Sequence, residues 1–327
     1  MLKKLSCAYG ISGFEEEIIS MLIKEIKPYA TKVTLDSFGN LYAFKKGTNS
    51  KKTIALFSHT DEVGLIVSDI TDDGYLKFRT VGGIDSAVLL GKRVVVGKDR
   101  LSGVIGSRAV HLLSEQEKKE KISIDKLYID IGARDKIEAE KYVQKGAPVF
   151  FEGFWYETDS CLFGKAFDDR AGCYILTELI KETYENDIYF VFTAQEETGL
   201  RGALVASRRV EADEYIVVEN TTCLDLPSVP SQKTSTVLGD GTALSVVDGA
   251  SFADVSLREE LKASGEKIQF KNMATGGNDA GAVSTNGKRV ASVSVPCRYL
   301  HTPVGVISKS DISNTLNMLK TFLKGDK

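Results

Sequence analysis

The chain has 327 residues, of which 43% are hydrophobic and 27% charged, as in an ordinary globular protein. Its 42 basic and 45 acidic side chains leave a net charge of −3, so it lacks the basic excess that nucleic-acid binding favours. We expect about two domains from the length, no membrane-spanning helix because long apolar runs are missing, and no signal peptide because the N-terminus turns acidic early.

Five cysteines are scattered along the chain and none forms a Cys-x-x-Cys pair. An odd, unpatterned set of this kind is typical of free thiols in a reducing compartment. We therefore predict a cytoplasmic protein without disulfides. The cysteines are Cys7, Cys161, Cys173, Cys223 and Cys297.

The N-terminal region predicts a helix and then a hairpin. Apolar residues recur every four positions from Phe14 to Ile26 and predict one apolar face of a helix over Phe14–Lys27. Ser12 is placed to cap this helix, and Pro28 ends it. The expected hairpin strands are Lys32–Asp36 and Leu41–Lys45.

Short, continuous apolar runs alternate with helical stretches through the rest of the chain. Such runs are typical of strands covered on both faces, and their alternation with helices predicts an α/β fold with a mostly parallel central sheet flanked by helices. The expected strands are Thr53–Ser58, Ile188–Thr193, Tyr215–Val218 and Ala291–Val295. The expected helices are Arg170–Thr183, Gly202–Ser207, Phe252–Ala263 and Ile307–Leu323.

Residues 67–161 have a different pattern, with short β-branched runs separated by glycine turns. We predict a small inserted β-barrel or β-sandwich domain here, with residues 1–66 and 162–327 forming the catalytic domain. The alternative is that this segment extends the main sheet. The charged run Glu115–Lys121 is expected at a solvated loop tip of the insert.

A histidine or carboxylate follows each of the expected buried strands, and an acidic pair precedes a helix. Because ligands of α/β sheets bind at the carboxyl ends of the strands, we expect these side chains to meet at one edge. The residues are His59 and Asp61, then Glu196 and Glu197, then Glu219, then His301, with Asp168 before the helix at Arg170.

Four carboxylates in one cleft need compensating charge. Asp168, Glu196, Glu197 and Glu219 carry four negative charges, which two divalent cations would neutralise. Imidazole and carboxylate ligands without thiolate suit zinc, cobalt or manganese, and one carboxylate bridging two ions would give a two-metal site. Each residue alone is more often structural, so the prediction depends on their joint placement. His111 lies in the insert and is interpreted as non-catalytic.

Four ordered motifs contain these residues: HTDEVG at 59–64, FDDRAG at 167–172, EETGLRGA at 196–203 and RYLHTP at 298–303, with GGNDAG at 276–281 as a further segment. They resemble the motifs of the dinuclear metallo-aminopeptidases of peptidase family M42, also called tetrahedral or glutamyl aminopeptidases or "cellulase M". The resemblance covers nearly the whole chain and includes the position of the insert.

The resemblance implies the fold of the zinc aminopeptidases and a role for each site residue. His59, Asp168 and Glu219 would hold one ion, and Asp168, Glu197 and His301 the other, with Asp168 bridging. Glu196 would be the general base, and Asp61 would orient His59. Two positions depart from the family pattern: Glu219 replaces the usual aspartate, and Asn278 stands where threonine is common.

The function implied is removal of the N-terminal residue from peptides. Two divalent ions, zinc most readily, would activate a bridging water, and Glu196 would take its proton and deliver it to the leaving amine. The family often forms homo-oligomers, commonly tetrahedral dodecamers, so we expect a homo-oligomer acting on peptides. The preferred first residue is open: Arg298 and Lys165 are candidates to favour an acidic one, or simply pair with carboxylates of the site.

Three other functions are open to the sequence. The adjacent acids Glu196 and Glu197 allow a glycoside hydrolase, although the chain has a single tryptophan for sugar stacking. A metal-dependent amidohydrolase or deacylase on the same scaffold would tolerate a blocked amine. A non-enzymatic protein whose metals only hold the fold would not need Glu196.

Overall fold

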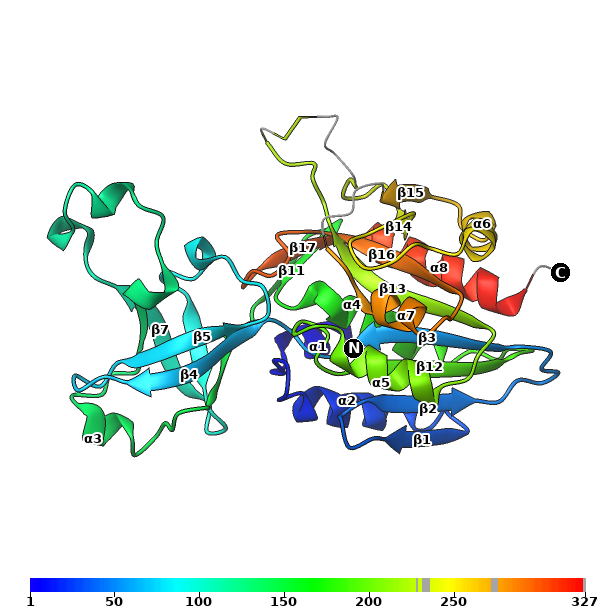
Figure 1. The fold of residues 1–327 in the computed structure, drawn as a ribbon. Coiled ribbons are helices and arrows are strands. Elements are labelled where there is room, and N and C mark those ends of the chain that lie inside the picture. The colour runs from blue at the N-terminus through cyan, green and yellow to red at the C-terminus, as the bar shows by residue number, and fades with distance from the viewer. Residues whose placement is uncertain (228, 231–235, 272–275, 326–327) are drawn as a thin grey trace.

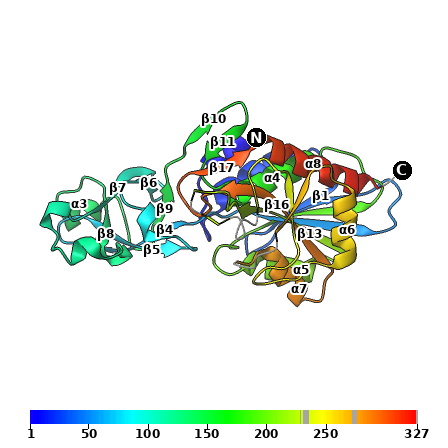
Figure 2. The same ribbon diagram turned by 90° about the horizontal axis from the view of Figure 1, so that it is seen from above.

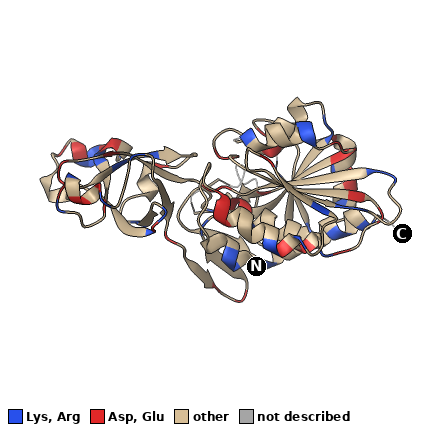
Figure 3. Cartoon of the chain, turned by 90° about the horizontal axis from the view of Figure 1, so that it is seen from below, with Lys and Arg blue, Asp and Glu red and all other residues tan. Residues whose placement is uncertain are grey.

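The computed structural model describes residues 1–227, 229–230, 236–271 and 276–325. It has two lobes, an α/β lobe and a smaller β lobe that projects from one side of it (Figures 1 and 2). Basic and acidic segments are interspersed over both lobes, as the near-balanced charge leads one to expect (Figure 3). Within the described parts of the chain, no helix is both long and apolar enough to cross a bilayer.

The α/β lobe is built on a mixed sheet of eleven strands in the described residues. The four central strands, β12, β3, β13 and β16, run parallel, and antiparallel strands flank them on both sides. The strand order is β1 (Lys32–Leu35), β2 (Leu41–Lys45), β12 (Asp187–Thr193), β3 (Thr53–His59), β13 (Glu214–Thr222), β16 (Val290–Arg298), β17 (Gly305–Ser308), β11 (Cys161–Gly164) and β10 (Trp155–Glu157), with β14 (Thr242–Ser245) and β15 (Ile268–Lys271) branching from β16.

Helices cover both faces of this sheet, so the central strands are buried along almost their whole length and are mostly apolar. Ile54 and Leu56 of β3 face one core, and Ala55 and Phe57 face the other, because successive side chains of a strand alternate. The first core is closed by α1 (Leu2–Cys7), α2 (Glu16–Ile26), α4 (Phe167–Leu179), α6 (Val255–Ala263) and α8 (Lys309–Lys324). The second core is closed by α5 (Arg201–Arg209) and α7 (Asp279–Thr285).

The β lobe is a closed six-stranded antiparallel barrel with its own apolar core. The inserted barrel is therefore confirmed. The alternative, that residues 67–161 extend the main sheet, is wrong for the barrel strands, although Trp155–Glu157 near the end of this segment pairs with the main sheet through β11. The barrel strands are β4 (Gly64–Ile70), β5 (Leu76–Val81), β8 (Leu127–Asp130), β7 (Leu101–Ser107), β6 (Arg93–Val96) and β9 (Pro148–Phe151). Short helices lie at its ends: α3 (Lys136–Ala139), η1 (Ser86–Val88), η2 (Val110–Leu112), η3 (Glu117–Lys119) and η4 (Ile124–Lys126).

Several predicted helices start two or three residues later than expected, each for its own reason. Helix α2 begins at Glu16 because Ser12 donates its hydroxyl to a distant carboxylate instead of capping the helix. Helix α6 begins after Asp254, whose side chain accepts from the Leu257 amide. Helix α8 begins after Ser308, because Gly305–Ser308 pairs as a strand with β11 and β16.

The last central strand continues past the proline at which we expected it to end. Pro296 lies opposite Thr221 of β13, between the residues of β16 that pair with β14 and those that pair with β17. The missing N–H of Pro296 therefore removes no hydrogen bond from the pairing of β16 with β14 or with β17. The continuation carries the chain toward His301.

Candidate metal centre

The carboxyl ends of the four parallel strands meet at one edge of the sheet. His59 is the last residue of β3, directly opposite Thr193 of β12, so the two loops that follow start side by side. Glu219 lies inside β13, and His301 follows β16 by three residues. The structure thus brings together every candidate residue: His59, Asp61, Asp168, Glu196, Glu197, Glu219 and His301.

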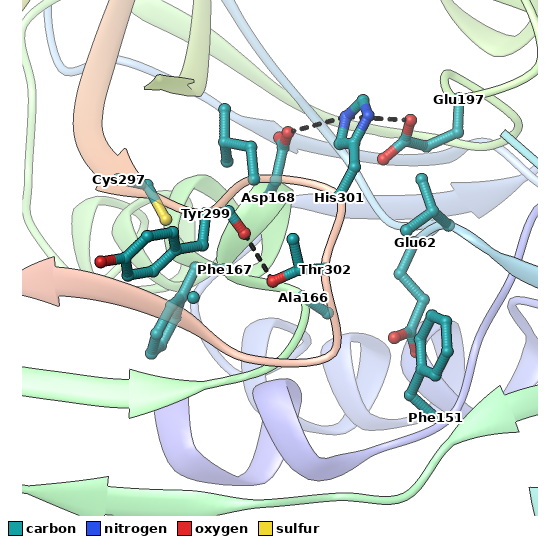
Figure 4. A pocket seen from close by; sticks show the side chains of 13 residues that line it. Glu62, Phe151, Ala166, Phe167, Asp168, Glu197, Cys297, Tyr299, His301 and Thr302 are labelled. Atoms are coloured by element: carbon teal, nitrogen blue, oxygen red, sulfur yellow. Dashed lines mark hydrogen bonds and ion pairs between the residues drawn. The ribbon is translucent and has the colours of Figure 1, made fainter. Parts of the chain in front are cut away.

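Asp168 lies between the two histidines. Its Oδ1 is 3.2 Å from His59 Nε2, and its Oδ2 is 3.5 Å from His301 Nε2. The same nitrogen of His301 is 3.4 Å from Glu197 Oε2, so this ring is flanked by two carboxylates (Figure 4). One carboxylate therefore joins two imidazoles, each with further acidic neighbours.

His59 faces two more carboxylates. Its Nε2 lies 3.9 Å from Glu219 Oε2 and 3.9 Å from Glu196 Oε2. Two sets of side chains have donor atoms close enough together to share an ion: His59 with Asp168 and Glu197, and His59 with Asp169 and Glu219. The second set includes Asp169, whose oxygens already accept from Ser58 Oγ at 2.5 Å and the Gly172 amide at 3.0 Å.

Burial of the acidic groups dominates their titration. It raises the pKa of Glu197 to about 8 and holds the pKa values of Glu196 and Glu219 well above the usual range. The neighbouring carboxylates add to these increases. A buried edge with this many acids therefore resists full ionisation unless positive charge is brought to it.

The imidazoles respond in the opposite way. Burial acts to lower the pKa of His301, but its hydrogen bond to Asp168 and the charge of Glu197 outweigh burial and raise the pKa to about 9. His59 behaves similarly, since the charges of Glu219 and Glu196 hold its pKa well above normal despite its burial. Both rings are thus placed where a cation is strongly favoured.

Asp61 connects His59 to the loop that carries the glutamate pair. The His59 Nδ1 lies 3.1 Å from the Asp61 carbonyl oxygen and 3.4 Å from its Oδ1. The Asp61 carboxylate also accepts from the backbone amides of Glu196, at 2.9 Å, and Glu197, at 3.1 Å. One fully buried side chain therefore contacts three site residues.

Residues in the left-handed backbone region flank the site. Ala166, Gln195, Tyr299 and His301 have φ between 52° and 62°, although none is a glycine. Such a conformation costs roughly 1–2 kcal/mol per residue. These costs fall in the loops that aim Asp168, the glutamate pair and His301, which is where functional sites concentrate backbone strain.

The β lobe supplies one group that the sequence did not reveal. The Gly83 carbonyl oxygen, just after β5, accepts a hydrogen bond from His301 Nδ1 at 2.9 Å. A backbone carbonyl has no sequence signature, so only the packing of the two lobes exposes this contact. His111, by contrast, lies exposed in η2 on the β lobe.

An open cleft of about 610 Å³ lies over these residues. Lys271 lines it, together with Glu196, Glu219 and Asn220. The basic residues considered from the sequence do not line this cleft. Arg298 pairs with Asp225 at 2.5 Å, and buried Lys165 pairs with Glu62 at 2.6 Å.

The donor set fits divalent metal ions. It consists of imidazole nitrogens and carboxylate oxygens without thiolate, the preference of zinc and its first-row neighbours. Glu219 Oε1 is buried and has no hydrogen-bond partner in the described residues, so it is free to coordinate. The extra methylene of Glu219 thus still brings its carboxylate to the centre.

Asn278, the second position that departs from the resemblance, has a structural task. Its Oδ1 accepts from the Ala280 amide at 2.9 Å and from Ser292 Oγ at 3.2 Å, so it caps α7 beside the cleft. A buried acceptor with two donors is well satisfied.

Comparisons with known proteins place the chain in a family. The model of the M42 glutamyl aminopeptidase family matches residues 39–318. A lysyl aminopeptidase of Pyrococcus furiosus is 30% identical, and the alignment covers 99% of this chain and 96% of that protein. The chain therefore belongs to peptidase family M42, and it is a peptide hydrolase.

Solved structures agree with this assignment. A TET aminopeptidase from a marine sediment thaumarchaeon has a TM-score of 0.95 and 34% identity, covering 99% of this chain and 94% of that one. The Pyrococcus horikoshii TET1 peptidase, which assembles into a tetrahedron or an octahedral shell, has a TM-score of 0.88 and 32% identity, covering 98% of each chain. A structure from Thermotoga maritima named an endoglucanase is also similar, with a TM-score of 0.83, 33% identity and coverage of 99% of this chain and 96% of that one.

Replacing Asp168 with alanine tests whether the centre holds metal. The substitution removes the carboxylate between the two imidazoles, and we expect the affinity for zinc to fall by at least about 10–100-fold, the scale of losses from altered metal-site partners. Metal content after dialysis against a graded chelator series, measured by mass spectrometry, reports the change. The matched control, Asp159→Ala, alters an exposed acid and should keep the wild-type content; equal retention by both variants would contradict the assignment.

Proposed function

We propose that this protein is a dinuclear metallo-aminopeptidase that removes the N-terminal residue from peptides. The observation that carries the proposal is Asp168, whose two oxygens face His59 and His301 at 3.2 Å and 3.5 Å. A carboxylate shared in this way suits a pair of ions. Zinc is the metal proposed, with cobalt and manganese as alternatives.

We assign His59, Asp168 and Glu219 to one ion, and Asp168, Glu197 and His301 to the other. Asp168 is preferred to Asp169 because the latter's oxygens already accept from Ser58 and Gly172. Bound divalent ions lower the pKa of water and polarise a carbonyl group, which is the chemistry that peptide hydrolysis needs.

Glu196 acts as the general base in this proposal. Its Oε2 reaches toward His59 at 3.9 Å and lies in the wall of the cleft, where an attacking water would approach a bound peptide. Burial raises the pKa of this carboxyl above its usual range, which makes its ionised form a stronger base than an exposed glutamate. It would take the proton of the attacking water and deliver it to the leaving amine.

Asp61 holds this arrangement in place. Its carboxylate accepts the amides of Glu196 and Glu197 while the residue also contacts the Nδ1 side of His59. A partner on the far ring nitrogen fixes the tautomer and direction of a ligating histidine.

A glycoside hydrolase is less well supported by the site. The two glutamates face different imidazoles, Glu196 toward His59 and Glu197 toward His301, rather than flanking one bond. Trp155, the one tryptophan, packs against Phe167 at a centroid distance of 5.9 Å and does not line the cleft. A purely structural metal site leaves Glu196 without a purpose.

Replacing Glu196 with glutamine should abolish turnover and leave the metals bound. The amide cannot take a proton, so we expect kcat to fall by about 10²–10⁴-fold. Hydrolysis of aminoacyl anilides, assayed with zinc, cobalt and manganese in turn, measures the loss. Glu185→Gln, the same change at an exposed residue, is the control. Wild-type turnover by Glu196→Gln would overturn the base assignment.

A free α-amine on the substrate separates an aminopeptidase from a deacylase of the same scaffold. We expect cleavage of an aminoacyl anilide and none of its N-acetyl form, because the acidic centre favours a cationic amine and an acetyl group removes that charge. Initial rates on the two substrates, at matched concentration, provide the comparison. Faster hydrolysis of the acetylated compound would favour the deacylase.

We also propose that the chain works in the cytoplasm as a homo-oligomer, with a dodecamer as the expected form. The shell-forming relative supports assembly, and five free cysteines suit a reducing compartment. Sedimentation velocity should find a species of about twelve times the 35.7 kDa chain mass. A single monomer peak across the concentration range would contradict the assembly and leave the chemistry untouched.

A further inference from the structure

Three consecutive backbone amides of the loop that carries Glu196 and Glu197 donate hydrogen bonds to two buried carboxylates. The amides of Glu196 and Glu197 donate to Asp61 at 2.9 Å and 3.1 Å. The amide of Gln195, which has φ of 56°, donates to Glu15 Oε1 at 3.1 Å. Glu15 thus completes a support for this loop although it lies 180 residues away along the chain.

Glu15 and Ser12 both belong to the segment between α1 and α2. Glu15 is 7% exposed, and its Oε1 also accepts from the Gly13 amide at 2.9 Å. Ser12 is 8% exposed and donates its hydroxyl to Asp61 Oδ2 at 2.5 Å. Burial and the charge of Asp61 raise the pKa of Glu15 to about 7. The ionised side chain is therefore less stable here than it would be on the surface.

The segment that precedes Ser12 is fixed by two buried cations. Arg170 is fully buried and donates to the carbonyl oxygens of Leu5, at 2.7 Å, and Gly10, at 3.1 Å. Lys165, 1% exposed, donates to the carbonyl oxygen of Ala8 at 2.6 Å and also pairs with Glu62. Buried charges are costly unless fully hydrogen-bonded, and here three of their bonds go to the backbone of residues 5–10 while Arg170 Nε donates to the Thr60 carbonyl oxygen.

The same segment is also joined to the loop after β3. The Glu62 amide donates to the Gly10 carbonyl oxygen at 2.9 Å, and the Gly10 amide donates to Glu62 Oε1 at 3.2 Å. Residues 1–15, here called the N-terminal arm, therefore contact two of the segments that carry site residues: the loop of His59 to Glu62 and the loop of Gln195 to Glu197.

We propose that Ser12 and Glu15 are positioning residues, through which the N-terminal arm holds the loop of Glu196 and Glu197 in register with the metal ligands. Ser12 acts through Asp61, and Glu15 acts through the Gln195 amide. This inference rests on the proposed function, in which Glu196 is the base and Glu197 a ligand. Small displacements of such groups have large effects on rate.

Glu15→Ala removes the acceptor of the Gln195 amide and is the main test. We expect kcat on an aminoacyl anilide to fall by about 10-fold or more with KM changed by less than about twofold, since the binding groups remain. Glu15→Gln keeps an oxygen that can accept the same two amides, so we expect it to remain within about twofold of wild type. Glu16→Ala alters the exposed neighbouring acid and should leave kcat unchanged.

Amide hydrogen exchange gives a readout that does not depend on turnover. In Glu15→Ala, the peptide containing Gln195 to Glu197 should exchange about 10-fold faster, while the barrel strands keep wild-type protection. Metal content and thermal midpoint are measured alongside. A loss of kcat with unaltered exchange at 195–197, or a loss that follows only metal content or unfolding, would overturn the positioning role.

The two proposals fail in different ways. Absence of aminopeptidase activity in the wild-type chain refutes the proposed function. Wild-type kcat in both Glu15→Ala and Ser12→Ala, with an active wild type, refutes the positioning role alone. Restoration of activity and of exchange protection by Glu15→Gln, but not by Glu15→Ala, supports it.

Discussion

The repulsion between carboxylates gathered at one buried edge is the constraint on which this structure depends. Asp168, the adjacent pair Glu196 and Glu197, and Glu219 come from three separate segments and converge on two imidazoles. Burial raises the pKa values of the three glutamates, whereas hydrogen bonds from both histidines lower the pKa of Asp168 against the effect of its burial. Of these four acids, the one between the rings is thus the one best held in its ionised form, which suits the bridging role proposed for it.

The structure around this edge is organised to keep the convergent groups in place. Four residues with left-handed backbone conformation shape the loops around the site. Asp61, in the loop after β3, accepts the amides of Glu196 and Glu197 and so joins its own loop to the loop after β12. The β lobe contributes the Gly83 carbonyl to His301, so both lobes contact the centre. The barrel, which has its own apolar core, therefore also helps to orient a histidine of the site.

Much of the fold was predictable because it depends on local pattern. Continuous apolar runs such as Ile188–Thr193 identified strands buried on both faces, and the glycine-punctuated segment identified the barrel. Elements with weaker patterns were missed: α1, α7, β14, β15 and β17 are short, and their positions depend on packing against longer elements. Helix boundaries failed where a capping side chain had a distant partner, as Ser12 does with Asp61.

The sequence by itself determined which residue types end each buried strand, and hence that acids and histidines meet at one edge, because parallel strands present their carboxyl ends together. It also determined the barrel insertion and the family. Only the tertiary structure decided which oxygen faces which nitrogen, that Gly83 supports His301, and that Arg298 and Lys165 are already paired. It also joined Glu15 to Gln195. These contacts join residues far apart in the chain, often through backbone atoms common to every residue type, so no local pattern encodes them.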